Sequence, residues 1–281
     1  MMPSTYFSFP EQSDEMDFIF SFKQTCYDSS FYPFKVLSTR GLQQLDFEPI
    51  TILYGGNGSG KSTALNVIAE KIHAARDSLY NKTYFYPDYL RMCETNLPYD
   101  SENSRIITSD DVFHHLLTIR SRNQEIDHKK EALLKEYSDV KYSQVRFDSL
   151  ADYEQFKRMN QSRRKTQSQF VKDEHMATIP TYSNGESAFR FFTEKITENR
   201  LYLLDEPENS LSPKLQVELV RFLEDSVRFF GCRFILSTHS PFLLALQGAK
   251  IYDLDQNPVA VKYWTELENV QIYLHFFRSK I

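Results

Sequence analysis

The sequence predicts an α/β fold in which a mostly parallel sheet is flanked by helices. The main evidence is an alternation of strand and helix patterns after residue 183. "LYLLDEPE" is an apolar run that ends in acids, and "RFILSTHS" is a second apolar run of the same type. Between them, "SPKLQVELVRFLEDSVRFFG" predicts a helix with Ser212 as N-cap, Pro213 at its first position and Gly231 at its end. Strands that alternate with helices in this way form parallel sheets, whose ligands bind at the carboxyl ends of the strands.

The first part of the chain supplies further elements. Between Phe34 and Tyr54 we expect two short strands around "STRGLQQLDFEP", the second being "ITILY", and we assign antiparallel strands to this N-terminal region. In "STALNVIAEKIHAA" the residues Leu65, Ile68 and Ile72 recur at helical spacing and predict a helix with one apolar face. "KTYFYPDYL" predicts another strand, ended by Pro87.

The middle of the chain, residues 91–182, is polar and charged, and we expect it to be a helical insertion within a single domain of residues 1–281. Ile126, Leu133 and Val140 lie seven residues apart, but the pattern is too short for a coiled coil. "KRMNQSRRK" carries a basic cluster, which is either a solvated helix face or a contact for a phosphate backbone. Its members are Lys157, Arg158, Arg163, Arg164 and Lys165.

Composition disfavours several classes of protein. The formal net charge of -5 provides no global attraction for nucleic acid. The 3 cysteines lie far apart, which predicts neither a disulfide framework nor a zinc site. The N-terminus lacks a basic segment followed by an apolar run, and no apolar stretch is long enough to span a membrane. We therefore expect a cytoplasmic protein without a membrane segment.

The stretch "GGNGSGKS" follows the strand "ITILY", precedes the first predicted helix and fits the pattern G-x-x-x-x-G-K-[ST]. In this motif, backbone N–H groups surround a phosphate and the helix N-terminus adds partial positive charge. Lys61 is expected to reach the β- and γ-phosphates as a catalytic cation, and Ser62 to ligate Mg²⁺. The nucleotide-binding residues predicted here are Gly55, Asn57, Gly58, Ser59, Gly60, Lys61, Ser62 and Thr63.

Two later strand ends add candidate catalytic residues. Asp205 ends "LYLLD" and is expected to hold Mg²⁺, and the adjacent Glu206 to orient and deprotonate an attacking water. His239 ends "FILSTH" on what should be a neighbouring strand. Its imidazole could hydrogen-bond a γ-phosphate and report that the phosphate is present.

The stretch "TYSNGESAFRFF" has two interpretations. Ser183 and Glu186 have the spacing of a capping box, in which two side chains satisfy the exposed donors of a helix start. Alternatively, the stretch contributes to a nucleotide site on another copy of the chain. The two interpretations are compatible.

In chain order, a Walker A loop, a Ser-x-Gly-Glu element, a Walker B strand with an adjacent glutamate, and a terminal histidine resemble the ABC ATPase superfamily. The segments "LYLLDEPENSLSP", "RFILSTHSPFLLALQGAKIYDLD" and "WTELENVQIYLHFF" resemble its RecF/SMC-like branch of stand-alone AAA-family ATPases. The resemblance covers residues 34–83 and 181–281 and leaves the middle region unmatched.

This resemblance implies a P-loop NTPase that binds ATP and Mg²⁺ and hydrolyses ATP. Two heads of such proteins pack head-to-tail around two ATP molecules. Ser183, Gly185 and Glu186 would then face the γ-phosphate bound to the partner head, and Ser210 to Pro213 would cross the interface. The implied function is an ATPase whose ATP-dependent homodimerisation drives or gates a protein partner, either an effector or a nucleic-acid-processing system.

Three features depart from the family pattern. Glu186 stands where transporter signatures usually have glutamine, the "KTYFYPDYL" segment is not followed by the expected glutamine, and the insertion is short for a DNA-tethering protein. The alternatives are a DNA-binding ATPase of the RecF/SMC-like type, the ATPase subunit of a membrane transporter, and an ATP-sensing switch with negligible turnover.

Overall fold

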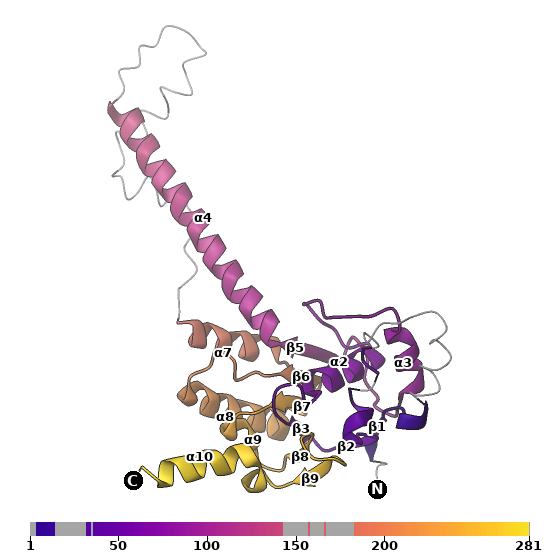
Figure 1. Cartoon of the computed structure of the whole chain (residues 1–281). Helices are drawn as coiled ribbons and strands as arrows, with labels where there is room; N and C mark the ends of the chain where they lie inside the picture. Colours follow the sequence, from indigo (N-terminus) through magenta and orange to yellow (C-terminus); the bar gives the residue numbers. More distant parts are fainter. Residues whose placement is uncertain are drawn as a thin grey trace. The chain divides into compact units, whose positions relative to one another are not determined.

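The computed structural model describes residues 4–14, 32–34, 36–142, 157, 166 and 183–280 (Figure 1). By compactness the chain divides into two units, one made of Met1–Phe113 with Ser183–Ile281 and the other of His114–Tyr182. All of the predicted site residues lie in the first unit. No helix of the described residues is long and apolar enough to cross a membrane.

A six-stranded sheet with the order β5-β6-β7-β3-β8-β9 forms the centre of the first unit (Figure 1). Its strands are β3 (Ile50–Tyr54), β5 (Ser104–Thr108), β6 (Leu201–Asp205), β7 (Arg233–Thr238), β8 (Lys250–Asp253) and β9 (Ala260–Lys262). Neighbouring strands are parallel except β8 and β9, which are antiparallel. The predicted mostly parallel sheet is confirmed, and the carboxyl ends of β6, β7 and β3 lie side by side.

Helices pack on this sheet. They are α2 (Lys61–Lys71), α7 (Asn184–Lys195), α8 (Pro213–Phe230), α9 (Pro241–Leu244) and α10 (Glu268–Arg278). Helix α2 contacts β6 and β7, while α8 contacts both α7 and α9. Figure 1 shows α2 and α8 on opposite sides of the strands. The caps of α8 are as predicted, because Ser212 accepts a hydrogen bond from the N–H of Leu215 and Gly231 ends the helix at φ 64°.

The register of the strands places polar side chains in a row. Thr108, Asp205 and Ser237 are register partners on β5, β6 and β7, so their side chains point to the same face of the sheet. Two residues earlier on β6, Leu203 belongs to the buried core that includes Leu65 of α2. The polar row therefore lies at the carboxyl end of the face that α2 covers.

The N-terminal antiparallel strands form a separate sheet of order β2-β1-β4, made of β1 (Thr5–Ser8), β2 (Gln44–Phe47) and β4 (Glu94–Thr95). The strand expected before "STRGLQQLDFEP" is wrong, because residues 38–40 form the 3₁₀ helix η1 (Ser38–Arg40) and the strand β2 falls inside that stretch. Gly41, at φ 66°, turns the chain out of η1 before β2 begins.

The strand predicted for "KTYFYPDYL" is also wrong, because these residues lead into the helix α3 (Tyr86–Met92). Pro87 lies in the first turn of α3, where its fixed φ and missing N–H are tolerated. Tyr86 and Tyr89 are buried against the core, so this aromatic segment packs as a helix.

The region 91–182 contains an element that the sequence did not predict. Strand β5 lies within it and pairs with β6, so the central sheet extends into the range assigned to the insertion. The expected helical character begins after it, with α4 (Ser109–Tyr142). Arg158, Arg163, Arg164 and Lys165 of the basic cluster lie outside the described residues.

Candidate functional site

The predicted phosphate loop is the short connection, residues 55–60, between β3 and α2. Gly60 is the N-cap of α2 and has φ 97°, and because it has no side chain it offers no side-chain acceptor to the N–H groups of the first turn. At Gly55 a Cβ atom would lie 2.5 Å from Ser59 Oγ, which explains why this position needs glycine. Among the described residues, none accepts a hydrogen bond from the backbone N–H of Gly60, Lys61 or Ser62. Three donors at a helix N-terminus form a site for an anion.

Lys61 is buried beneath this loop, with 5% of its side chain exposed. Its ammonium donates to the carbonyl oxygens of Gly55 at 2.7 Å and Gly56 at 3.0 Å, and lies 3.7 Å from Glu206 Oε1. The cation is thus held at the loop, beside the acid predicted to activate water.

Ser62 and Asp205 meet as predicted for a magnesium site. The Ser62 hydroxyl donates to Asp205 Oδ1 at 2.9 Å, and the Ser237 hydroxyl donates to the same oxygen. Burial raises the pKa of Asp205, although the hydrogen bonds from Ser237 and Ser62 act in the opposite direction. A hydroxyl and a carboxylate are oxygen donors of the kind that Mg²⁺ prefers, so these two residues fit the ion.

Glu206 lies directly after β6 with a left-handed backbone of φ 48°, which is unusual for a residue with a side chain. Its Oε1 faces Lys61 at 3.7 Å and His239 Nδ1 at 3.8 Å, and its Oε2 accepts a hydrogen bond from Asn209 Nδ2. The strand end therefore directs this carboxylate toward the phosphate loop and the histidine, and its action on a water molecule stays a prediction.

His239 follows β7, and its backbone is fixed from two sides. Its N–H donates to Glu208 Oε1 at 2.9 Å, and its carbonyl accepts a hydrogen bond from Asn269 Nδ2 at the start of α10. The side chain is 48% exposed, with Nδ1 turned toward the two glutamates. The histidine is therefore held rigidly at its backbone and presents its ring to solvent.

The Ser183 to Glu186 segment forms the capping box predicted from its spacing. The Ser183 side chain accepts from the Glu186 N–H at 3.3 Å, and Glu186 Oε2 accepts from the Ser183 N–H at 3.0 Å and the Ser183 hydroxyl at 2.8 Å. These hydrogen bonds lower the pKa of Glu186, the one from the Ser183 hydroxyl most of all. The local role of both residues is confirmed, and their contact with a second nucleotide stays a prediction.

The structure explains why position 185 is a glycine, which the sequence pattern did not indicate. A Cβ atom there would lie 2.9 Å from Leu215 Cδ1 and 3.2 Å from the Ser210 carbonyl oxygen. The start of α7 is therefore in close contact with the turn before α8, the segment that the family resemblance places at a dimer interface.

The phosphate loop and Glu206 line a pocket of about 190 Å³, which we call the phosphate pocket. It is lined by Asn57, Gly58, Ser59, Gly60, Lys61, Ser62, Thr63 and Glu206. An adjacent hollow of about 450 Å³ lies between the loop and α10, with Asp255 and His239 in its wall. The Ser183 segment lines neither of these hollows, and Figure 1 shows α7 apart from α2.

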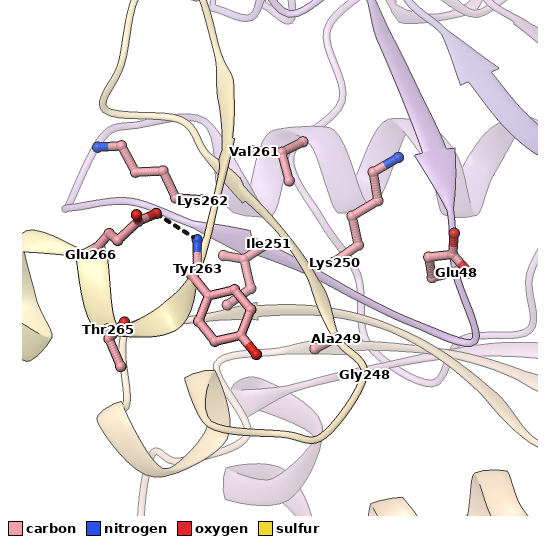
Figure 2. A pocket seen from close by; sticks show the side chains of 10 residues that line it. All are labelled: Glu48, Gly248, Ala249, Lys250, Ile251, Val261, Lys262, Tyr263, Thr265 and Glu266. Atoms are coloured by element: carbon pink, nitrogen blue, oxygen red, sulfur yellow. Dashed lines mark hydrogen bonds between the residues drawn. The ribbon is translucent and has the colours of Figure 1, made fainter.

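A further groove, of about 760 Å³, lies elsewhere on the first unit (Figure 2). Lys250 and Ile251 begin β8 and Glu48 precedes β3, so the groove lies at the amino ends of these strands. In Figure 2, Lys250 and Lys262 point away from one another, and Glu266 accepts from the backbone N–H of Tyr263. This groove is at the opposite end of the strands from the phosphate loop.

Several residues near the phosphate loop were missed by sequence reasoning. Asp255 Oδ2 accepts from the Gly56 N–H at 2.8 Å, and the Tyr54 hydroxyl accepts from the Asn269 N–H at 3.1 Å. Asp255 could have been found because it closely follows an apolar strand, as Asp205 does. Thr108 was missed because β5 was not predicted, and it lies beside Asp205 at the carboxyl end of β5.

Solved structures that are similar to this chain include two that cover most of it. One is a chain of the structure titled "An inward-facing conformation of a putative metal-chelate type ABC transporter", with 18% identity, a TM-score of 0.38, and coverage of 83% of this chain and 82% of that one. The other is an Smc head domain from Pyrococcus furiosus with an extended coiled coil, bound to the C-terminal domain of ScpA, with 15% identity, a TM-score of 0.40, and coverage of 84% and 95%. Functionally curated proteins give no match.

A family model matches residues 95–245, and its description is "AAA domain, putative AbiEii toxin, Type IV TA system". The matched range begins after the phosphate loop and contains the capping-box segment, the acidic strand end and His239. Because the match extends over more than half of the chain, the protein belongs to this family and is an ATP-binding ATPase of the AAA type.

Proposed function

We propose that this protein hydrolyses ATP with Mg²⁺ between two copies of the chain that pack head-to-tail, and that assembly and release of the dimer drive or gate a partner. The observation that carries the proposal is the division of the predicted site. Lys61 and His239 each lie within 4 Å of Glu206, whereas Ser183 contacts none of these three among the hydrogen bonds and ion pairs of the described residues. One chain thus holds most of a site, and a second copy could complete it.

Each residue has a part in this proposal. The N–H groups of the loop and Lys61 bind the β- and γ-phosphates, while Ser62 and Asp205 hold Mg²⁺, which neutralises charge on the phosphates when bound. Glu206 orients the attacking water and accepts its proton, and the contact of Glu206 with Lys61 keeps this carboxylate at the phosphate pocket. His239 donates to the γ-phosphate through its exposed ring.

The partner chain contributes the start of α7. Ser183 and Gly185 would meet the γ-phosphate, and the partial positive charge of the helix N-terminus would favour its binding. Glu186 is already engaged with Ser183, so we assign it the task of holding this turn in shape. The family description names a type IV toxin–antitoxin system, which favours an effector as the partner that the dimer controls.

A mixing experiment tests the composite site. Lys61→Ala removes the phosphate-loop cation from one chain, and Ser183→Arg obstructs the contributed segment of the other, so neither variant alone should hydrolyse ATP. A heterodimer keeps one intact site, made of the phosphate loop of the Ser183→Arg chain and the α7 start of the Lys61→Ala chain. An equimolar mixture should therefore recover about a quarter of the wild-type rate, because half of the dimers carry one working site of two.

Phosphate release is measured for each variant alone and for the mixture over a range of protein concentrations. Recovery should rise with concentration, as expected for assembly of two chains. A mixture that stays as inactive as its components, or a Ser183→Arg variant that hydrolyses ATP at the wild-type rate, rules out the shared site.

A further inference from the structure

Glu208 is a buried acid to which the predicted mechanism assigns no role. It lies two residues after Glu206, in the turn between β6 and α8, and 6% of its side chain is exposed. Its Oε2 is buried with no hydrogen-bond partner among the described residues. Burying a carboxylate costs free energy unless hydrogen bonds or charges compensate. The compensating contacts of Glu208 must therefore come from its other oxygen, Oε1.

Those contacts converge on one short segment. Glu208 Oε1 accepts hydrogen bonds from the Thr238 hydroxyl at 2.7 Å, the His239 N–H at 2.9 Å and the Ser240 N–H at 3.2 Å. The donors belong to three successive residues at the end of β7. One oxygen atom therefore fixes the backbone on both sides of the histidine.

The same oxygen also faces the imidazole. His239 Nδ1 lies 3.3 Å from Glu208 Oε1 and 3.8 Å from Glu206 Oε1. Nδ1 therefore points toward the two carboxylates, and among the described residues it is near them without a hydrogen bond to either. Nε2, on the other side of the ring, is the nitrogen available to a ligand.

We propose that Glu208 is a positioning residue for His239, which holds the histidine at its backbone so that Nδ1 faces the two glutamates and Nε2 meets the γ-phosphate. This inference rests on the proposed function, in which His239 contacts that phosphate. Glu208 does not touch the nucleotide and acts through the histidine alone. The turn that carries Glu206 thereby also sets the geometry of the second catalytic side chain.

The kinetic test uses Glu208→Gln, which keeps an acceptor oxygen and the shape of the side chain but removes the charge. Hydrogen bonds to a charged acceptor are about twice as strong as neutral ones, so kcat should fall about tenfold with KM for ATP nearly unchanged. In the His239→Ala background the same substitution should have no further effect on kcat. An equal tenfold loss in both backgrounds, or an unchanged kcat in the single variant, overturns the positioning role.

The control variant is Glu224→Gln. Glu224, on α8, also accepts a hydrogen bond from the backbone of another segment, the Gln247 N–H at 2.9 Å, but it forms no hydrogen bond or ion pair with His239 in the described part of the chain. It should leave kcat and KM as in the wild type. If Glu224→Gln lowered kcat equally, the loss at Glu208 would be a general effect of neutralising a glutamate, and the proposal would fail.

A spectroscopic test separates this inference from the proposed function. The ¹⁵N spectrum of the histidine rings is recorded without nucleotide, and the His239 signals are identified among the 7 histidines by their loss in His239→Ala. We expect one sharp set of His239 signals in the wild type and shifted or broadened signals in Glu208→Ala, because the histidine loses the hydrogen bonds that fix its backbone. His239 signals that are the same in both proteins reject the positioning role, whereas the expected change in a protein that hydrolyses no ATP would reject only the proposed function.

Discussion

The phosphate loop and the Ser183 segment both lead into a helix N-terminus, but they finish that N-terminus differently. At α2 the N-cap is Gly60, which offers no side-chain acceptor, so the first N–H groups remain for a ligand. At α7 the N-cap is Ser183, and its capping box with Glu186 satisfies donors within the chain. The first end is built to be completed by an anion and the second is stable by itself. This difference is what a head-to-tail pair requires, because the contributed segment must keep its shape before the partner arrives.

The largest expected effect is on the affinity for ATP, which should depend on the phosphate loop and not on the Ser183 segment of the same chain. Lys61→Met removes a buried cation from the phosphate loop, and the loss of a charged contact to phosphate should weaken ATP binding about 100-fold. Ser183→Arg should leave ATP binding to the chain's own loop unchanged at protein concentrations where the chain is a monomer. Isothermal titration with ATP and Mg²⁺ measures both.

Lys82→Met is the matched control for this comparison, because Lys82 pairs with Glu70 at 2.7 Å on the surface and lies outside the phosphate pocket. It should bind ATP as the wild type does. Should Ser183→Arg weaken ATP binding of the monomer as strongly as Lys61→Met, the two regions would belong to one site within the same chain.

The next largest effect is on ATP hydrolysis, the step for which both regions are proposed to be needed. Glu206→Gln removes the proposed base, so turnover should fall by about 10²- to 10⁴-fold, while ATP binding is retained. The variant should then accumulate as a dimer at saturating ATP, because hydrolysis no longer releases the partner. Light scattering with and without ATP measures the mass, and a variant that remains monomeric at saturating ATP contradicts the sandwich mechanism.

A smaller effect probes the contact between α7 and the turn before α8. Gly→Ala normally favours a helix, but the added Cβ at Gly185 would meet Leu215 Cδ1 at 2.9 Å and the Ser210 carbonyl at 3.2 Å. Overpacking should therefore lower the free energy of unfolding by about 1–3 kcal/mol. Urea titration measures this change.

The double variant Gly185→Ala/Leu215→Ala gives the corresponding control, since it removes the nearer of the two obstructing groups. Part of the loss caused by Gly185→Ala should be regained relative to Leu215→Ala alone. A Gly185→Ala variant that is more stable than the wild type would mean that α7 and the turn before α8 adjust freely to one another.

The smallest effect concerns the charge of Asp205. Burial raises its pKa in the folded state above the unfolded value, so the folded chain binds this proton more tightly. Protonated Asp205 therefore stabilises the folded chain at pH values below its unfolded pKa. This stabilisation is lost as the pH rises through its folded pKa. Asp205→Asn, which keeps an acceptor for Ser62 and Ser237, should raise the free energy of unfolding at pH 7 by about 1 kcal/mol in the absence of Mg²⁺ and nucleotide.

Thermal unfolding of the wild type and Asp205→Asn at pH 4 and pH 7 measures this effect. The stability difference between them should be greater at pH 7, and Mg²⁺ with ATP should stabilise the wild type alone. A difference that does not change with pH would show that Asp205 carries no protonation-linked cost.

The sequence predicted best where a local pattern determines the result. The caps of α8 depend on the conformations of Ser212 and Gly231, and the phosphate loop depends on closely spaced glycines, so both were located correctly. Prediction from the sequence failed where tertiary packing overrides the local preference of the residues for a strand or a helix. Tyr86 and Tyr89 give a strand-like composition, but their burial against the core requires the helix α3.

Long-range pairing explains the remaining errors and omissions. Strand β5 is recognisable only because β6, distant in sequence, accepts it at the edge of the sheet. Glu208 and Asp255 take their roles from residues on other strands, which no local spacing could indicate. The proposed sharing of the site between two copies has one indication in the geometry of a single chain, which is the separation of Ser183 from the phosphate pocket.

The left-handed backbone of Glu206 has a consequence for protein engineering. Position 206 combines φ 48° with a side chain, which costs stability at that backbone conformation, and the carboxyl group of Asp205 next to it is buried. A library of variants selected for thermal tolerance alone would find improvements at both positions, such as glycine at 206 and asparagine at 205. Under the proposed function, both substitutions would abolish ATP turnover while leaving the fold intact, so a selection for thermal tolerance would have to be coupled to a measurement of ATP turnover.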